Sequence, residues 1–163
     1  MPSARMHEAG TLAFSWAEFD PYLRGSIVAY PFSWFEASYQ YTDINNALYS
    51  NSPDFSGDQT YKDKSFDGKV RLLAESHFIP ALAIGARDVA GTGVFSSEYI
   101  VASKKVSNID FTLGMGWGVL SGNSITNPLA RLSDSFTSRT NLTTTRGGEF
   151  NTGYFFRGNA GLF

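Results

Sequence analysis

The stretch Ile109-Asp-Phe-Thr-Leu-Gly-Met-Gly-Trp-Gly118 shows the strictest alternation of side chains in the chain. Every second residue, from Ile109 to Trp117, is large and apolar, and the residues between them are small or polar. Successive side chains of a β-strand point to opposite faces of a sheet, so this period of two predicts a strand. Its second face ends in Gly114, Gly116 and Gly118, which suits a crowded interior better than a water-facing surface.

The same alternation occurs in other segments, which predicts an all-β chain. No segment sustains the 3.6-residue apolar period of an amphipathic helix. The predicted strands are residues 11–19, 23–30, 34–42, 65–74, 80–89, 96–104 and 109–118, and an eighth begins near Phe150. Residues 44–64 and 122–148 are rich in Asn, Ser, Thr and Gly and are predicted to be long polar loops.

Connection lengths predict how these strands are arranged. The connections after the second, fourth and sixth predicted strands are short, whereas those after the third and seventh are long and that after the fifth is moderate. The tight Asp20-Pro21 reversal is the exception. Short turns at one end and longer loops at the other are typical of outer-membrane barrels. The pattern predicts an antiparallel up-and-down meander of about seven or eight strands, forming part of a transmembrane outer-membrane β-barrel.

Aromatic residues, 15% of the chain, support this prediction through their positions. Tyr30, Phe32 and Trp34 flank one predicted turn, and Tyr41 lies at the far end of the next strand. Tyr and Trp favour the membrane–water boundary, where they form girdles around membrane barrels. A soluble β-sandwich or small barrel, with the apolar face as its core and the other face in water, remains the alternative.

Composition excludes several classes of function. With 13 basic and 15 acidic residues, the formal charge is −2, so nucleic acid is not an expected partner. The absence of Cys excludes disulfides, thiolate metal sites and cysteine nucleophiles. No apolar run approaches the ~18 residues of a membrane-spanning helix. At 163 residues, the chain is expected to form one domain, residues 1–163.

No catalytic residue, cofactor or metal site is predicted. His7 and His77 lack acidic or histidine neighbours at metal-ligand spacing. Glu36 with the pair Asp54 and Asp58 would supply the two carboxylates that a glycosidase needs. Residues 54 and 58 occur in a predicted polar loop, however, which favours the interpretation that their carboxylates are simply exposed to solvent.

The face opposite the large apolar residues is predicted to line a polar lumen. Its charges would either pair across neighbouring strands as a rigid plug or bind a hydrated sugar chain. The predicted lumen-facing residues are Glu36, Asp67, Lys69, Arg71, Arg87, Glu98, Lys104 and Asp110. The predicted lipid-facing residues are Phe14, Trp16, Phe35, Tyr39, Val70, Leu72, Leu82, Ile84, Phe111, Leu113 and Trp117.

Several runs of residues, in order along most of the chain, resemble the YjbH-like (GfcD-like) exopolysaccharide and capsule biosynthesis proteins of Gram-negative bacteria. The most distinctive is Gly91-Thr-Gly-Val-Phe-Ser-Ser-Glu-Tyr-Ile-Val-Ala-Ser-Lys104. Others are Pro2-Ser-Ala-Arg-Met6, Asp20-Pro-Tyr22, Pro31-Phe-Ser-Trp-Phe-Glu-Ala37, Tyr39-Gln-Tyr-Thr-Asp43, Gly57-Asp-Gln-Thr-Tyr-Lys-Asp-Lys64, Lys69-Val-Arg-Leu-Leu73, Pro80-Ala-Leu-Ala-Ile-Gly-Ala-Arg-Asp88 and Asp110-Phe-Thr-Leu-Gly-Met-Gly-Trp-Gly118.

This resemblance implies a lipoprotein-type component of the bacterial outer membrane that acts in exopolysaccharide or group 4 capsule export and is not an enzyme. Family members are longer, so the chain is expected to be an amino-terminal part of such a barrel. The implied partners are outer-membrane lipid, an exopolysaccharide chain and other export proteins. Two alternatives stay open: a soluble β-domain that binds polysaccharide or protein partners, and an outer-membrane enzyme whose carboxylates lie in the loops.

Overall fold

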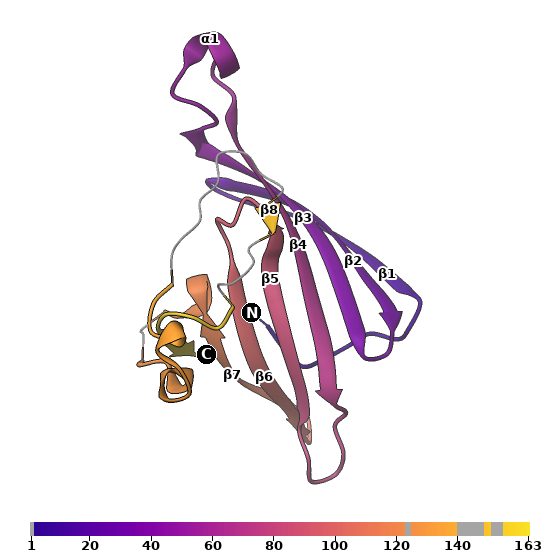
Figure 1. Cartoon of the computed structure of the whole chain (residues 1–163). Coiled ribbons are helices and arrows are strands. Elements are labelled where there is room, and N and C mark those ends of the chain that lie inside the picture. Colours follow the sequence, from indigo (N-terminus) through magenta and orange to yellow (C-terminus); the bar gives the residue numbers. More distant parts are fainter. Residues whose placement is uncertain (1, 123–124, 140–148, 151–154) are drawn as a thin grey trace.

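The computed structural model describes residues 2–122, 125–139, 149–150 and 155–163, and its strands form one antiparallel sheet (Figure 1). The strands are neighbours in chain order from β1 to β7, β9 then pairs with β7, and the short β8 pairs with β5. Their bounds are β1 (Thr11–Phe19), β2 (Tyr22–Phe32), β3 (Phe35–Leu48), β4 (Thr60–Leu73), β5 (Ala81–Gly91), β6 (Ser97–Val106), β7 (Ile109–Trp117), β8 (Glu149–Phe150) and β9 (Ala160–Leu162).

The predicted all-β meander is confirmed, but the first predicted long loop is wrong. β3 and β4 continue into residues 44–64 as a hairpin that projects beyond the other strands and carries α1 (Pro53–Ser56) near its tip (Figure 1). Asp43 of β3 lies opposite Lys62 of β4 and forms an ion pair with it. Polar cross-strand pairs of this kind stabilise a hairpin without the apolar alternation by which a strand is recognised in sequence.

The chain after β7 contains short helical turns. These are η1 (Gly118–Leu120), η2 (Pro128–Arg131) and η3 (Asp134–Phe136). The strand expected near Phe150 is the two-residue β8, and β9 lies further along the chain. Residues 140–148, within the second predicted loop, lie outside the described residues. No helix in the described part of the chain has the length and apolarity needed to cross a membrane.

The described strands form an open sheet. β1 lies at one edge and β9 at the other, and no pairing among the described residues joins them. These strands therefore do not close into a barrel by themselves.

The register divides the sheet into two chemically different faces, because directly paired residues lie on the same side. One lateral row consists of Glu36, Lys69, Gly85, Tyr99 and Gly116. The next row, one residue along each strand, lies on the opposite side and consists of Phe35, Val70, Ile84, Ile100 and Met115. We call the side of the first row the polar face and the side of the second row the apolar face.

The buried cluster of the molecule lies on the polar face. It contains Tyr99 and Val101 with three alanines, and the partly buried Leu120 and Phe163 pack against it. Glycines make this packing possible, since a Cβ at Gly85 would overlap the Tyr99 ring and a Cβ at Gly114 would overlap the Phe163 ring. The expectation that small residues on these strands suit a crowded interior is thus confirmed at Gly114.

The apolar face exposes its large side chains. Phe14 is 71% exposed, Trp16 63% and Leu113 68%. This is the reverse of a water-soluble sheet, in which the large apolar residues pack inward and the charged residues face solvent.

Candidate functional site

The residues before β1 cross the polar face, and we call residues 2–10 the crossing segment. The Ala4 amide donates a hydrogen bond of 3.0 Å to the Ser103 hydroxyl of β6. The Lys69 ammonium donates to the Arg5 carbonyl at 2.9 Å, and the Gly10 amide donates to the Tyr30 carbonyl at 2.7 Å. The crossing segment is therefore held at several points between β6 and β2.

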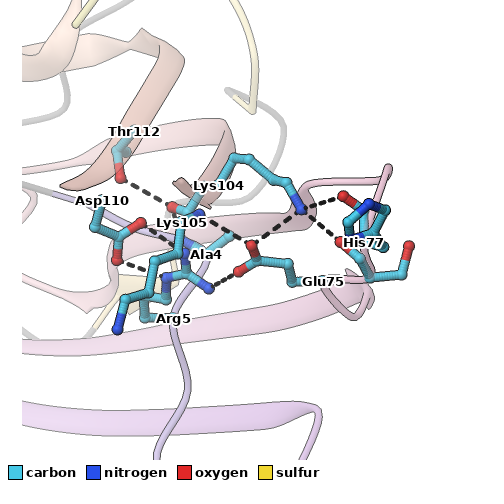
Figure 2. A network of polar contacts seen from close by, with 10 residues as sticks. Ala4, Arg5, Glu75, His77, Lys104, Lys105, Asp110 and Thr112 are labelled. Atoms are coloured by element: carbon cyan, nitrogen blue, oxygen red, sulfur yellow. Dashed lines mark hydrogen bonds and ion pairs between the residues drawn. The ribbon is translucent and has the colours of Figure 1, made fainter. Parts of the chain in front are cut away.

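Arg5 attaches this segment to one end of the sheet (Figure 2). Its guanidinium donates two hydrogen bonds, of 2.8 and 2.6 Å, to the Asp110 carboxylate and forms an ion pair with Glu75. Glu75 also accepts a 2.9 Å hydrogen bond from the Lys105 amide and lies 3.2 Å from the Lys104 ammonium. The cluster thus joins the crossing segment to the β4–β5 connection and to the ends of β6 and β7 beside the turn between them.

Electrostatics favour the charged state of this cluster. The hydrogen bond from Arg5, followed by that from the Lys105 amide, lowers the pKa of Glu75 to about 2. Glu75 therefore remains an anion and an ion-pair partner of Arg5 throughout the neutral and mildly acidic range.

The connection between β5 and β6 covers the other end of the polar face. The Thr92 hydroxyl donates a hydrogen bond to Asp63, and the Phe95 amide donates one of 3.1 Å to Asp88. The Arg24 guanidinium lies 4.6 Å from the centre of the Phe95 ring, within the range of a cation–π contact. Side chains of the sheet thereby hold this loop in place.

Between these two ends, the crossing segment and the sheet line a partly open cavity of about 440 Å³. Its charged lining residues occur in pairs. Lys69 lies 2.6 Å from Glu36, whereas Arg87 lies 3.7 Å from Asp67 and so makes a looser contact. We take this cavity, with its polar lining, as the candidate functional site.

Most residues predicted to line a lumen lie together on the polar face. By register these are Glu36, Asp67, Lys69, Arg71, Arg87 and Asp110. The first three and Arg87 line the cavity, while Asp110 belongs to the Arg5 cluster.

Glu98 and Lys104 differ from the prediction, because the register places them on the apolar face. Both lie an even number of residues from Ile100, which pairs with Ile84. Glu98 is nevertheless 2% exposed, since its carboxylate binds the Arg139 guanidinium at 2.6 and 3.0 Å and accepts the Phe156 amide at 2.9 Å. The alternation of β6 is ambiguous because Tyr99 and Val101 occupy one face and Ile100 the other.

The residues predicted to face lipid share the apolar face, with two differences. In register these are Phe14, Trp16, Phe35, Tyr39, Val70, Leu82, Ile84, Phe111, Leu113 and Trp117. Trp117 is only 1% exposed, because the Phe156 ring packs edge-on against it at 5.0 Å. Leu72 lies where the β4–β5 register shifts, between Arg71 and Leu73, and is exposed.

Sequence reasoning missed Arg5, Glu75 and Arg139. Arg5 and Arg139 lie outside the regular strands, and Glu75 lies in a turn, so no alternation indicates their direction. Their partners are separated from them by 29 residues or more in sequence. The sequence shows only that these three residues are charged, and charge alone does not identify the residue with which each one pairs.

The candidate enzyme and metal residues are dispersed. Among the described residues, no group of three or more His, Cys, Asp or Glu side chains has metal-binding geometry. Asp54 and Asp58 are exposed at the β3–β4 tip, while Glu36 lies at the opposite end of β3. At about 3.3 Å per strand residue this separation is roughly 40 Å, far beyond the 5–10 Å between the carboxylates of a glycosidase.

Comparisons with known proteins identify the family. The family model YjbH, described as "Exopolysaccharide biosynthesis protein YbjH", matches residues 1–163. "Uncharacterized lipoprotein YjbH" of Escherichia coli (strain K12) is 46% identical over 164 residues, which cover 99% of this chain and 23% of the relative. No solved structure matches the chain. On the full-length family match and this identity, the chain belongs to the YjbH family of exopolysaccharide biosynthesis proteins.

Proposed function

We propose that this chain forms part of a transmembrane β-barrel in the bacterial outer membrane, and that the barrel acts in exopolysaccharide or capsule export without catalysing a reaction. The apolar face faces lipid and the polar face lines the lumen. The chain spans 23% of the length of its curated relative, so this proposal concerns its part in a larger protein.

The observation that carries the proposal is the exposure of large apolar side chains on one face of the sheet. Phe14, Trp16 and Leu113 are each more than half exposed, while the charged pairs of the cavity and the buried cluster lie on the other face. Lipid stabilises such an apolar face, whereas water does not.

The open edges set a condition on the proposal. Unpaired backbone groups are costly in hydrocarbon, so a membrane sheet has to be closed. In the membrane, β1 and β9 therefore pair with further strands at their free edges.

Two lysine substitutions in β1 test the orientation. Phe14 lies on the apolar face and its neighbour Ser15 on the polar face, paired with Ser26. Lysine facing lipid costs roughly 2–4 kcal/mol near the midplane, whereas lysine in a lumen costs little. Phe14→Lys is expected to reduce the amount of full-length protein in the outer-membrane fraction, and Ser15→Lys to leave it unchanged. The readout is fractionation followed by immunoblotting.

The outcome distinguishes the proposal from a soluble domain. Phe14 is 71% exposed, so a lysine there would be harmless in water. Equal assembly of both variants, or recovery of the wild-type protein from the periplasm without detergent, would contradict the proposal.

The non-catalytic role has its own test. The cavity carboxylates Glu36 and Asp67 both have cationic partners, and Asp54 and Asp58 lie at the exposed hairpin tip. The double variant Asp54→Asn with Asp58→Asn is expected to leave secreted polymer, measured as total hexose, at the wild-type level. A loss of polymer turnover in a correctly assembled double variant would instead support an enzyme.

A further inference from the structure

The cavity under the crossing segment has the size of a small-ligand site. Its volume of about 440 Å³ lies within the range of 300–1,000 Å³ that such sites occupy. Strands β2 to β6 and the crossing segment contribute to its lining, including Ser38 and Gln40 of β3, Lys69 of β4 and Arg87 of β5. Both walls are held in place, since Lys69 binds the Arg5 carbonyl and Ala4 binds Ser103.

The charges of the lining balance. Glu36 is paired with Lys69, and Asp67 with Arg87. The Arg5 guanidinium, the remaining strong cation of the lining, is bound to Glu75 and Asp110. A charged ligand would have to displace one of these pairs, so the cavity favours an uncharged ligand.

The hydrogen-bonding groups suit hydroxyls. A hydroxyl both donates and accepts, and the cavity offers carboxylate acceptors, cationic donors and the two-sided amide of Gln40. The contact of the Gln40 amide with Thr42 is long, at 3.4 Å, and the Arg87 guanidinium lies 3.7 Å from Asp67. Both contacts are weak, so Gln40 and Arg87 keep N–H groups that can donate to a ligand.

We infer that this cavity is a binding subsite for a neutral, hydroxyl-rich saccharide, with Ser38, Gln40 and Arg87 as contact residues. This inference rests on the proposed function and deepens it, because it assigns one place on the lumen wall where the exported chain is bound. The crossing segment forms the opposite wall of the subsite.

The test uses full-length protein in a detergent without a sugar headgroup. The probes are the neutral disaccharides cellobiose and maltose, with glucuronate as a charged comparison, and binding is measured by saturation-transfer NMR. The variant Ser38→Ala with Gln40→Leu removes two polar groups without adding bulk to the cavity. Ala37→Val, on the apolar face of the same strand, is the matched control.

Wild type and Ala37→Val are expected to bind at least one neutral disaccharide, and the double variant to bind it about thirtyfold more weakly, from about 1 kcal/mol for each of the two lost hydrogen bonds. Absence of binding by the wild type, equal binding by all three proteins, or binding of glucuronate alone would overturn the inference. Recovery of each protein in the outer-membrane fraction is measured in parallel. Correct insertion with equal binding refutes the subsite alone, whereas failure of the wild type to insert refutes the proposed function.

Discussion

At the scale of single residues, Arg5 makes the contacts that organise one end of the site. It binds Asp110 with two hydrogen bonds and Glu75 with an ion pair, so a residue before the first strand is linked to the start of β7 and to the β4–β5 connection. Paired hydrogen bonds between Arg and carboxylate are charge-assisted and fix the geometry of both partners. Arg5 thereby positions the crossing segment over the cavity.

Arg5→Ala is expected to release the crossing segment, because all three charged contacts to its guanidinium are lost. The measurement is limited proteolysis, in which cleavage within residues 2–10 should become several-fold faster. Arg131→Ala is the control, since Arg131 is exposed and forms no ion pair in the described part of the chain. Equal cleavage rates in both variants would show that Arg5 does not hold the segment.

The Glu75 contact predicts a dependence on pH. The pKa of Glu75 falls from 4.5 to about 2 in the folded protein, so its contribution to stability is complete above pH 4.5 and is lost as pH falls toward 2. The melting temperature of the wild type should therefore decrease over this interval. In Glu75→Gln the decrease should be smaller, and an identical pH profile for both proteins would contradict the assignment.

At the scale of strands, the pairing of small with large residues decides how closely side chains pack on the polar face. Gly85 of β5 lies opposite Tyr99 of β6, and the Tyr99 ring occupies the space above the glycine. Tyr99 is buried there with Val101 and Ala83. In the packed part of the polar face, the Tyr99 ring therefore lies among small residues of the neighbouring strands.

Gly85→Ala and Gly68→Ala form a matched pair of substitutions within strands. A Cβ at Gly85 would overlap the Tyr99 ring, whereas a Cβ at Gly68 has no neighbour within 4 Å. Gly85→Ala should destabilise the protein by about 1–3 kcal/mol through overpacking. Gly68→Ala should be neutral or stabilising by up to about 1 kcal/mol. Denaturant unfolding measures both, and similar effects of the two substitutions would refute the close packing.

At the scale of the whole molecule, the segments outside the meander are attached to it by buried polar contacts. Arg139 and the Phe156 amide both bind the Glu98 carboxylate on the apolar face of β6. Phe156 also covers Trp117. The last part of the chain therefore shields one end of a face that is otherwise exposed.

Glu98→Gln is expected to loosen this attachment, because it leaves the Arg139 charge buried without its anion. Loss of one partner of a buried pair typically costs about 3–5 kcal/mol. Urea unfolding should detect the loss, and hydrogen exchange at Phe156 should accelerate. Glu18→Gln, at an exposed end of β1, is the control and should change neither measurement.

The alternation of residue types predicted the strands, their antiparallel order and most of the two faces. It succeeded where one face is strongly apolar, as in β7, because burial or lipid contact then dictates every second residue. It failed for the β3–β4 hairpin, where Asp43 and Lys62 stabilise each other across the strands. It also failed for Glu98, because apolar residues occur on both faces of β6.

The sequence by itself thus determined which residues share a face, because the two-residue period of a strand is a local property of the backbone. Only the tertiary structure decided what covers each face. The crossing segment, the Arg5 cluster and the Arg139–Glu98 pair join residues 20 to 105 positions apart, and the charge pattern of a sequence does not select among such partners. The cavity exists because those long-range contacts hold the crossing segment above the sheet, so its lining could not be read from any single strand.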